Sequence, residues 1–80
     1  MILTPEQCRA ARGLLDWTQE QLAQEAGVSR STVRDFEKLR HHLNRASEQH
    51  LIEAFARAGV VLIPMDAGGL GVRLVPSCQL

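Results

Sequence analysis

Apolar residues recur every three or four positions through most of this chain. Cys8, Ala11 and Leu15 keep this spacing in the first such segment, and Leu51 and Phe55 keep it in the last. An apolar stripe at that spacing is typical of an amphipathic α-helix, because one helical turn takes about 3.6 residues. The pattern predicts four helices, over approximately residues 5–15, 19–26, 30–38 and 45–58.

Residues suited to helix ends flank these segments. A side chain that can cap a helix N-terminus precedes each of them: Thr4, Thr18, Ser29 and Asn44. Gln21 follows Thr18 by three residues, as in a capping box. Gly27 and Gly59 come after the second and fourth segments, and glycine readily adopts the left-handed conformation that ends a helix. Periodicity and caps therefore predict the same boundaries.

The pattern changes after the fourth helix. Residues 60–63 form an apolar, largely β-branched run, residues 65–71 are rich in turn formers, and residues 72–75 form a second short run. This order predicts a β-hairpin with a longer loop. The predicted fold class is therefore mainly α, with four helices and a C-terminal β-hairpin.

The first predicted strand is apolar on both faces. Val60 and Leu62 face one side, and Val61 and Ile63 face the other. A lone hairpin is marginal in water, and four short helices are too few to cover both faces. We therefore expect a homodimer, formed by strand pairing across a two-fold axis or by packing of hairpin on hairpin.

Length and composition narrow the class of protein. Eighty residues suffice for one domain with a small core. No apolar run approaches the roughly twenty residues that span a membrane, and the N-terminus lacks a signal-peptide pattern, so we expect a cytoplasmic protein. Cys8 and Cys78 lie far apart, and no ligand spacing completes a zinc site with the three histidines. We expect reduced thiols, no metal, no cofactor and, without a nucleophile–base pair, no enzyme.

Charge is unevenly distributed, although the formal net charge is zero. Between residues 30 and 45 the chain carries five cations and only two acids. These cations are Arg30, Arg34, Lys38, Arg40 and Arg45. A basic stripe on a neutral chain indicates a local surface for nucleic acid.

The second and third predicted helices, joined at Gly27, form a helix-turn-helix unit. Residues 18–23 (TQEQLA), 27–33 (GVSRSTV) and 36–37 (FE) resemble the Xre family, which includes the lambda-type phage repressors and Cro proteins. The likeness extends over roughly residues 6–58. It implies a four-helix, lambda-repressor-like DNA-binding domain over residues 1–58, with the third helix in the major groove of double-stranded DNA. Residues 59–80 would then be the dimerisation hairpin and tail.

The resemblance also assigns roles to single residues. Base edges would be read by Arg30, Ser31 and Arg34, although Arg34 could instead pair with a nearby acid. Phosphate contacts, or in the alternative helix caps and solvated charges, are expected of Gln19, Ser29, Thr32, Lys38, Arg40 and Arg45. Arg12 and Glu37 correspond to a buried structural ion pair.

The chain departs from the family pattern at three positions. Leu39 stands where glycine commonly follows the third helix, and Leu43 stands where proline often precedes the fourth. Asp35 places an acid on the helix expected to face DNA. The conformation of the loop over residues 39–43 is left open by the sequence.

Two functions fit these features. The first is a sequence-specific transcription regulator, a repressor that binds an inverted-repeat operator as a homodimer. The second is an antitoxin-type interaction module, whose hairpin would dock on a partner toxin while the helices regulate its own gene.

Overall fold

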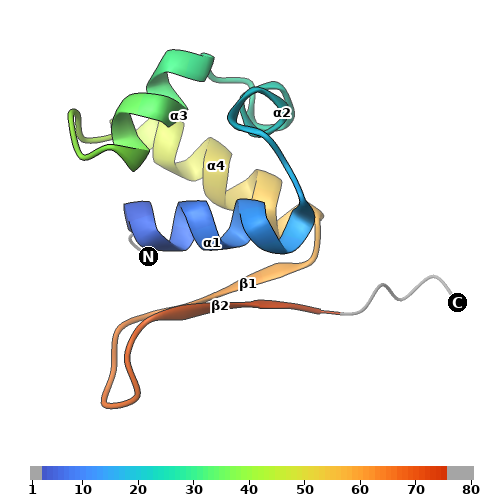
Figure 1. Ribbon diagram of the computed structural model, residues 1–80, viewed down its shortest axis with the longest axis vertical. Coiled ribbons are helices and arrows are strands. Elements are labelled where there is room, and N and C mark those ends of the chain that lie inside the picture. The colour runs from blue at the N-terminus through green and yellow to red at the C-terminus, as the bar shows by residue number, and fades with distance from the viewer. Residues whose placement is uncertain (1–2, 76–80) are drawn as a thin grey trace, which may run out of the picture.

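The computed structural model describes residues 3–75, which form four helices followed by a two-stranded hairpin (Figure 1). The helices are α1 (Pro5–Leu15), α2 (Gln19–Ala26), α3 (Arg30–Glu37) and α4 (Arg45–Arg57). The strands are β1 (Val60–Ile63) and β2 (Gly71–Leu74). The predicted fold class is confirmed. Four boundaries differ by one residue, because Lys38 and Ala58 are the C-caps of α3 and α4, and β2 both begins and ends one residue earlier than predicted.

The predicted caps occupy their positions. Thr4, Thr18, Ser29 and Asn44 each accept a hydrogen bond from the backbone N–H three residues later. Gly27 and Gly59 follow α2 and α4 with φ of 74° and 94°, which glycine adopts at little cost. Gln7 closes a second capping box, at α1, by accepting a hydrogen bond from the Thr4 N–H. These local contacts satisfy N–H groups that a helix start leaves without a partner.

One core joins the helices and the hairpin. Its largest fully buried side chains are Phe55, Leu22, Leu51, Val33 and Cys8. Trp17 stacks on Phe55 with their ring centroids 6.3 Å apart. Val60 and Leu62 are also buried, at 5% and 7% exposure, so one face of β1 belongs to this core. Cys78, the other cysteine, lies outside the described residues.

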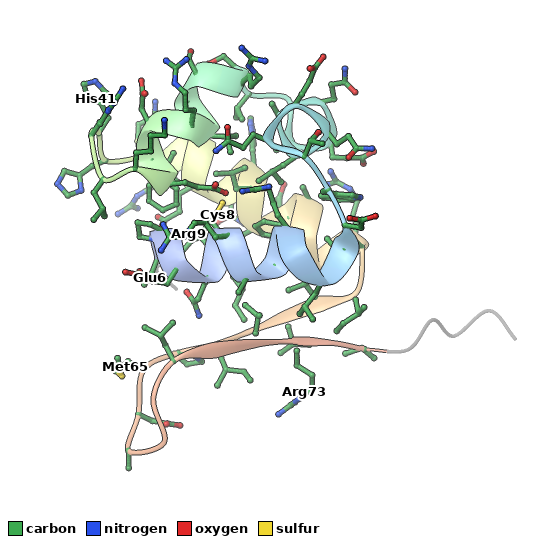
Figure 2. All side chains as sticks on the ribbon, viewed as in Figure 1. Glu6, Cys8, Arg9, His41, Met65 and Arg73 are labelled. Atoms are coloured by element: carbon green, nitrogen blue, oxygen red, sulfur yellow. The ribbon has the colours of Figure 1, made fainter. Side chains whose placement is uncertain are left out.

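The hairpin packs against α1 and α4 with its inner face. Val60 pairs with Leu74 and Leu62 with Val72 in the antiparallel register. The outer face carries Val61, which is 40% exposed, and Arg73, whose side chain points away from the helices (Figure 2). The helices of the same chain thus cover one face of the hairpin and leave the other uncovered.

Gln7 links α1 to the hairpin. Its amide nitrogen Nε2 donates to the carbonyl oxygens of Ile63 (3.0 Å) and Gly71 (3.1 Å), which are paired across the two strands. Gln7 is only 2% exposed, and its amide oxygen serves the α1 cap. A single buried amide therefore fixes both the start of the helix and the loop end of the hairpin.

The loop after α3 turns at Leu39, which has φ of 63°. Leu39 stands where the family commonly has glycine, and it adopts the left-handed conformation that glycine would supply. That conformation is unfavourable for a side chain with a Cβ atom. The sequence left the conformation of this loop open, and the structure gives it a left-handed turn at Leu39. No helix among residues 3–75 is both long and apolar enough to cross a membrane.

Candidate functional site

The site is built on α2, α3 and the turn between them. Gly27 ends α2, and Ser29 begins α3 two residues later, so the two helices meet across a short turn. Leu22 and Ala23 of α2 and Val33 of α3 are buried between these helices and α4. With its inner side fixed in this way, α3 turns its opposite side to solvent.

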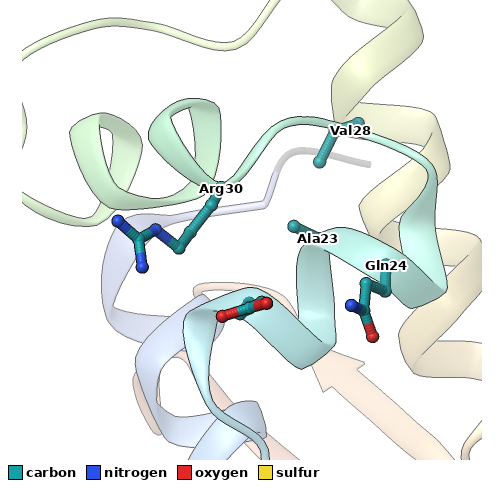
Figure 3. A pocket seen from close by; sticks show the side chains of 5 residues that line it. Ala23, Gln24, Val28 and Arg30 are labelled. Carbon is teal, nitrogen blue, oxygen red and sulfur yellow. The ribbon is translucent and has the colours of Figure 1, made fainter.

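The buried residues of α3 determine which of its residues lie on the outer side. Val33, Phe36 and Glu37 face the core. Since successive residues are rotated by about 100° around a helix axis, the side opposite them carries Ser31, Asp35 and Lys38. Arg30 and Arg34 lie beside these residues, on the flank nearer α2. Arg30 is exposed at the start of α3, where it borders a shallow hollow shared with α2 (Figure 3).

Arg34 is engaged by its neighbour. Its Nε donates to Oδ1 of Asp35 at 3.1 Å, and the two side chains are 40% and 20% exposed. The hydrogen bond from Arg34, together with the positive charges of Arg34, His41 and Arg40, lowers the pKa of Asp35 in spite of its partial desolvation. The sequence left Arg34 open between a base contact and a pairing with an acid, and the structure contains the pairing with an acid. Only Nε is used in this pairing, so the terminal nitrogens of the guanidinium group stay available.

The hydroxyl groups at the start of α3 bond to one another. Ser29 Oγ accepts from the Thr32 N–H at 3.1 Å and lies 2.7 Å from Thr32 Oγ1. Ser31 Oγ lies 3.2 Å from Ser29 Oγ. Ser29 is therefore a helix cap, and any contact of these hydroxyls with DNA has to share or replace these hydrogen bonds.

Gln19 lies at the first position of α2, half-buried. Its Nε2 donates to Oε1 of Glu37 at 3.0 Å. An amide nitrogen has two N–H groups, so the bond to Glu37 leaves the second one available. Nothing local to residues 18–21 indicates this contact with Glu37, so it could not be predicted from the sequence.

Glu37 is the centre of a buried polar network. It forms an ion pair with Arg12, in which Nη2 lies 2.7 Å from Oε1 and Nε lies 2.8 Å from Oε2. The Cys8 thiol donates to the same carboxylate at 3.0 Å. Arg12 Nη1 donates to the Trp17 carbonyl, so the guanidinium also fixes the connection between α1 and α2. Among the described residues, every buried side-chain nitrogen and oxygen has a hydrogen-bond partner.

Charges inside this network are set by opposing effects. Burial alone would raise the pKa of Glu37, but hydrogen bonds from Arg12, Cys8 and Gln19 outweigh it and lower the pKa. The pKa of Arg12 is raised by its hydrogen bond to Glu37. Burial, followed by the neighbouring carboxylate, raises the pKa of Cys8 far above its usual range. At neutral pH the network is an ion pair with a protonated thiol.

The remaining cations predicted as phosphate contacts lie in the loop after α3 or next to it. Lys38, Arg40 and Arg45 are all exposed. The loop is held to α3 because the Arg40 and His41 N–H groups donate to the Asp35 carbonyl oxygen. A hollow of about 190 Å³ lies between this loop, α3 and the start of α4. No cluster of three metal-ligating side chains occurs in the described part of the chain.

A family comparison agrees with this geometry. Residues 9–45 match the family model described as Helix-turn-helix. The matched segment is a helix-turn-helix of the Xre or lambda-repressor-like kind. The match extends from α1 to the first residue of α4, and therefore includes both helices of the motif and the loop after them. No curated protein matches the chain significantly.

The match to this family model supports a DNA-binding helix-turn-helix regulator. In such helix-turn-helix domains the second helix of the motif enters the major groove. Here that helix is α3, whose outer side is free of the core. Asp35 is the residue on this side that the sequence analysis did not assign, although its spacing from Ser31 places both on one helix face.

Proposed function

We propose that this Xre-family protein is a sequence-specific transcriptional repressor that binds an inverted-repeat operator as a homodimer. The observation that carries the proposal is the outer side of α3, where Arg30, Ser31 and Arg34 are accessible on a helix anchored through Val33, Phe36 and Glu37. A short rigid helix with such a side fits the major groove. Because a transcriptional repressor acts on DNA, we propose that the protein acts in the cytoplasm.

The proposed interface contains two kinds of contact, to base edges and to the phosphate backbone. Arg30, Ser31 and Arg34 read base edges, for which arginine prefers guanine. Backbone contacts come from Gln19, Ser29, Thr32, Lys38, Arg40 and Arg45. Phosphate contacts fix register and supply affinity that depends on salt, but carry no sequence information. The ion pair of Arg12 with Glu37 holds α3 against α1.

A second copy of the chain is needed because one short helix buries too little surface for tight specific binding. Val61 on the outer face of the hairpin is 40% exposed, and Leu74 and Val75 at the end of β2 are 41% and 40% exposed. We propose that the two-fold axis lies beside the hairpin.

The position of the hairpin favours strand pairing over face packing. The buried side of α3 contacts α1, and the hairpin contacts α1 as well (Figure 1). The outer side of α3 and the outer face of the hairpin therefore point in opposite directions. Copies packed outer face to outer face would turn their α3 helices away from each other. Copies joined at the strand edge of β2 would keep both α3 helices on one side, as one duplex requires.

Selection of bound sequences from random DNA tests the proposal. We expect the full chain to enrich a motif with two-fold symmetry, whose half-sites are about one turn of DNA apart. Ser31→Ala with Arg30→Ala serves as the matched control, because it removes two base contacts and leaves the exposed phosphate contacts unchanged. The control should bind DNA and enrich no more than the position that Arg34 reads. Absence of any enriched sequence with the parent chain would contradict the proposal.

The antitoxin alternative rests on the same uncovered apolar face. A toxin could occupy it in place of a second copy. Mass in solution separates the two candidates, because a repressor dimer forms from the chain alone. A chain that remains monomeric at high micromolar concentration would favour the antitoxin function.

A further inference from the structure

We propose that Asp35 is a positioning residue for specificity, which aims Arg34 at a guanine in the operator. The inference rests on the proposed function, because it takes α3 to be the helix that enters the major groove. It assigns a role to an acidic residue that at first sight opposes DNA binding.

The geometry requires Arg34 to turn across the helix surface. Adjacent residues on a helix point about 100° apart and do not face each other. Asp35 lies near the middle of the outer side, while Arg34 leaves the helix on the flank nearer α2. The hydrogen bond from Arg34 Nε to Asp35 Oδ1, at 3.1 Å, therefore draws the guanidinium toward the middle of the outer side.

The hydrogen bond uses the part of the guanidinium group that a base does not need. Nε is bound to Asp35, and within residues 3–75 the structure gives the terminal nitrogens Nη1 and Nη2 no acceptor. These two nitrogens can donate together to O6 and N7 of guanine. A free arginine side chain loses rotamer entropy when it binds, and Asp35 reduces that cost by fixing its direction in advance.

The acid itself is held firmly enough for this role. Its side chain is only 20% exposed, and its carbonyl oxygen accepts hydrogen bonds from the Arg40 and His41 N–H groups. The pKa of Asp35 lies below its usual 3.8 because Arg34 donates to it. The carboxylate is therefore charged at neutral pH. Its charge repels the phosphates and so lowers the affinity for all DNA sequences. At the same time, it improves the selection of guanine by Arg34.

This combination predicts effects of opposite sign. Asp35→Ala should weaken the preference for guanine at one position of each half-site by roughly five- to 150-fold, the range expected for loss of a two-point arginine contact. The same substitution should strengthen binding to random DNA, because it removes a negative charge from the surface that faces the phosphates. A residue with only a structural role would not produce both changes.

The experiment measures equilibrium binding to the selected operator, to operators altered at each position, and to random DNA. The variants are Arg34→Ala, Asp35→Ala and the double variant, with Glu25→Ala, an exposed acid on α2, as the matched control. We expect both single variants to lose the guanine preference at the same position. The double variant should lose little more than Arg34→Ala alone, because the two residues act as one unit. Arg34→Lys should also lose it, because an ammonium group lacks the two-point geometry.

Three outcomes would overturn the inference. The first is that Asp35→Ala keeps the guanine preference of the parent while Arg34→Ala loses it. The second is that Asp35→Ala changes the preference at a different position, which would make Asp35 a base reader in its own right. The third is that the parent selects no sequence, which would overturn the proposed function as well. The first two leave the proposed function intact, so the two failures are distinguishable.

Discussion

Glu37 connects three parts of the structure through one carboxylate. It lies at the end of α3, and it accepts hydrogen bonds from Arg12 and Cys8 of α1 and from Gln19 of α2. A charge in so buried a position, 4% exposed, is tolerated because every partner donates to it. The orientation of α3 therefore depends on a residue of its buried side.

Removal of this carboxylate should destabilise the fold strongly. We expect Glu37→Ala to lower the free energy of unfolding by about 3–5 kcal/mol, because Arg12 is left partly buried without its counterion. For a domain of this size that is a large share of the total stability. Thermal unfolding measures the change, and Glu53→Ala, an exposed acid on α4, should stay within about 0.5 kcal/mol of the parent. A midpoint for Glu37→Ala close to that of the parent would show that the network contributes little.

The same network predicts that the stability of the fold falls at acid pH. The folded state lowers the pKa of Glu37 below its usual 4.5, so the unfolded state takes up the proton first as pH falls. The stabilisation is complete well above pH 4.5 and is lost below it, as pH falls toward the folded-state pKa. Denaturant unfolding of the parent and of Glu37→Gln across this range should show their difference shrinking with acid. A constant difference between pH 7 and pH 3 would contradict the prediction.

Two arginines of the proposed interface should respond differently to removal. Arg30→Ala is expected to cost roughly 1–3 kcal/mol at one base position and to relax specificity there. Arg45→Ala should weaken binding to all sequences and reduce the salt slope by about one unit, because a phosphate contact releases a counterion. Binding to a set of operator variants at several salt concentrations separates the two effects. If both substitutions lower affinity evenly for all variants, Arg30 does not read a base.

At the scale of elements, the hairpin is tied to α1 by Gln7. Gln7→Glu keeps the oxygen that caps α1, and glutamate is a common residue in that capping position. The change replaces the Nε2 donor by an oxygen that faces the carbonyl oxygens of Ile63 and Gly71. We therefore expect Gln7→Glu to destabilise the chain by about 1–3 kcal/mol at pH 7, the penalty for a buried polar group without a partner.

The measurement is denaturant unfolding together with amide hydrogen exchange in the hairpin. Gln21→Glu is the matched control, since Gln21 completes the capping box of α2 and makes that contact at an exposed site. Its effect should be within about 0.5 kcal/mol. Equal effects of the two substitutions would mean that the link from Gln7 to the hairpin adds no stability.

At the scale of the whole molecule, the free edge of β2 is the part on which the proposed dimer depends. The Val75 N–H donates to the Gly59 carbonyl oxygen at 2.8 Å, which makes residues 59 and 75 a hydrogen-bonded pair. Pairs alternate in an antiparallel ladder, so the pair of Val60 and Leu74 is not hydrogen-bonded. The N–H of Leu74 therefore points to the free edge.

This geometry allows a substitution that affects the edge alone. Leu74→Pro removes the outward N–H and keeps the ladder with β1, so we expect it to convert the dimer to a monomer and to weaken operator binding. Val61→Lys places a charge on the outer face, and it should leave the dimer intact if the copies pair at their edges. Deletion of the hairpin is a poorer test, because Val60 and Leu62 belong to the core.

Mass in solution at tens of micromolar gives the result. A monomeric Val61→Lys with a dimeric Leu74→Pro would indicate face packing instead of edge pairing. Thermal unfolding of both variants separates loss of the partner from loss of the fold.

The sequence by itself determined the elements and their order. Helix periodicity, N-caps and the glycines after α2 and α4 are contacts between residues at most a few positions apart, so the local sequence contains them entirely. The helix-turn-helix unit followed from the same local signals. The pair of Arg12 and Glu37, 25 residues apart, was expected only from the family resemblance.

Tertiary structure decided how side chains are shared between elements. Gln19 was expected at a phosphate and also donates to Glu37, and Arg34 was left open between a base and an acid and pairs with Asp35. Gln7 was not singled out, although it fixes the hairpin. Each of these outcomes depends on which side-chain rotamer and which distant partner the packed helices allow. Spacing along a sequence fixes the face on which a residue lies, but only packing fixes the atom that it meets.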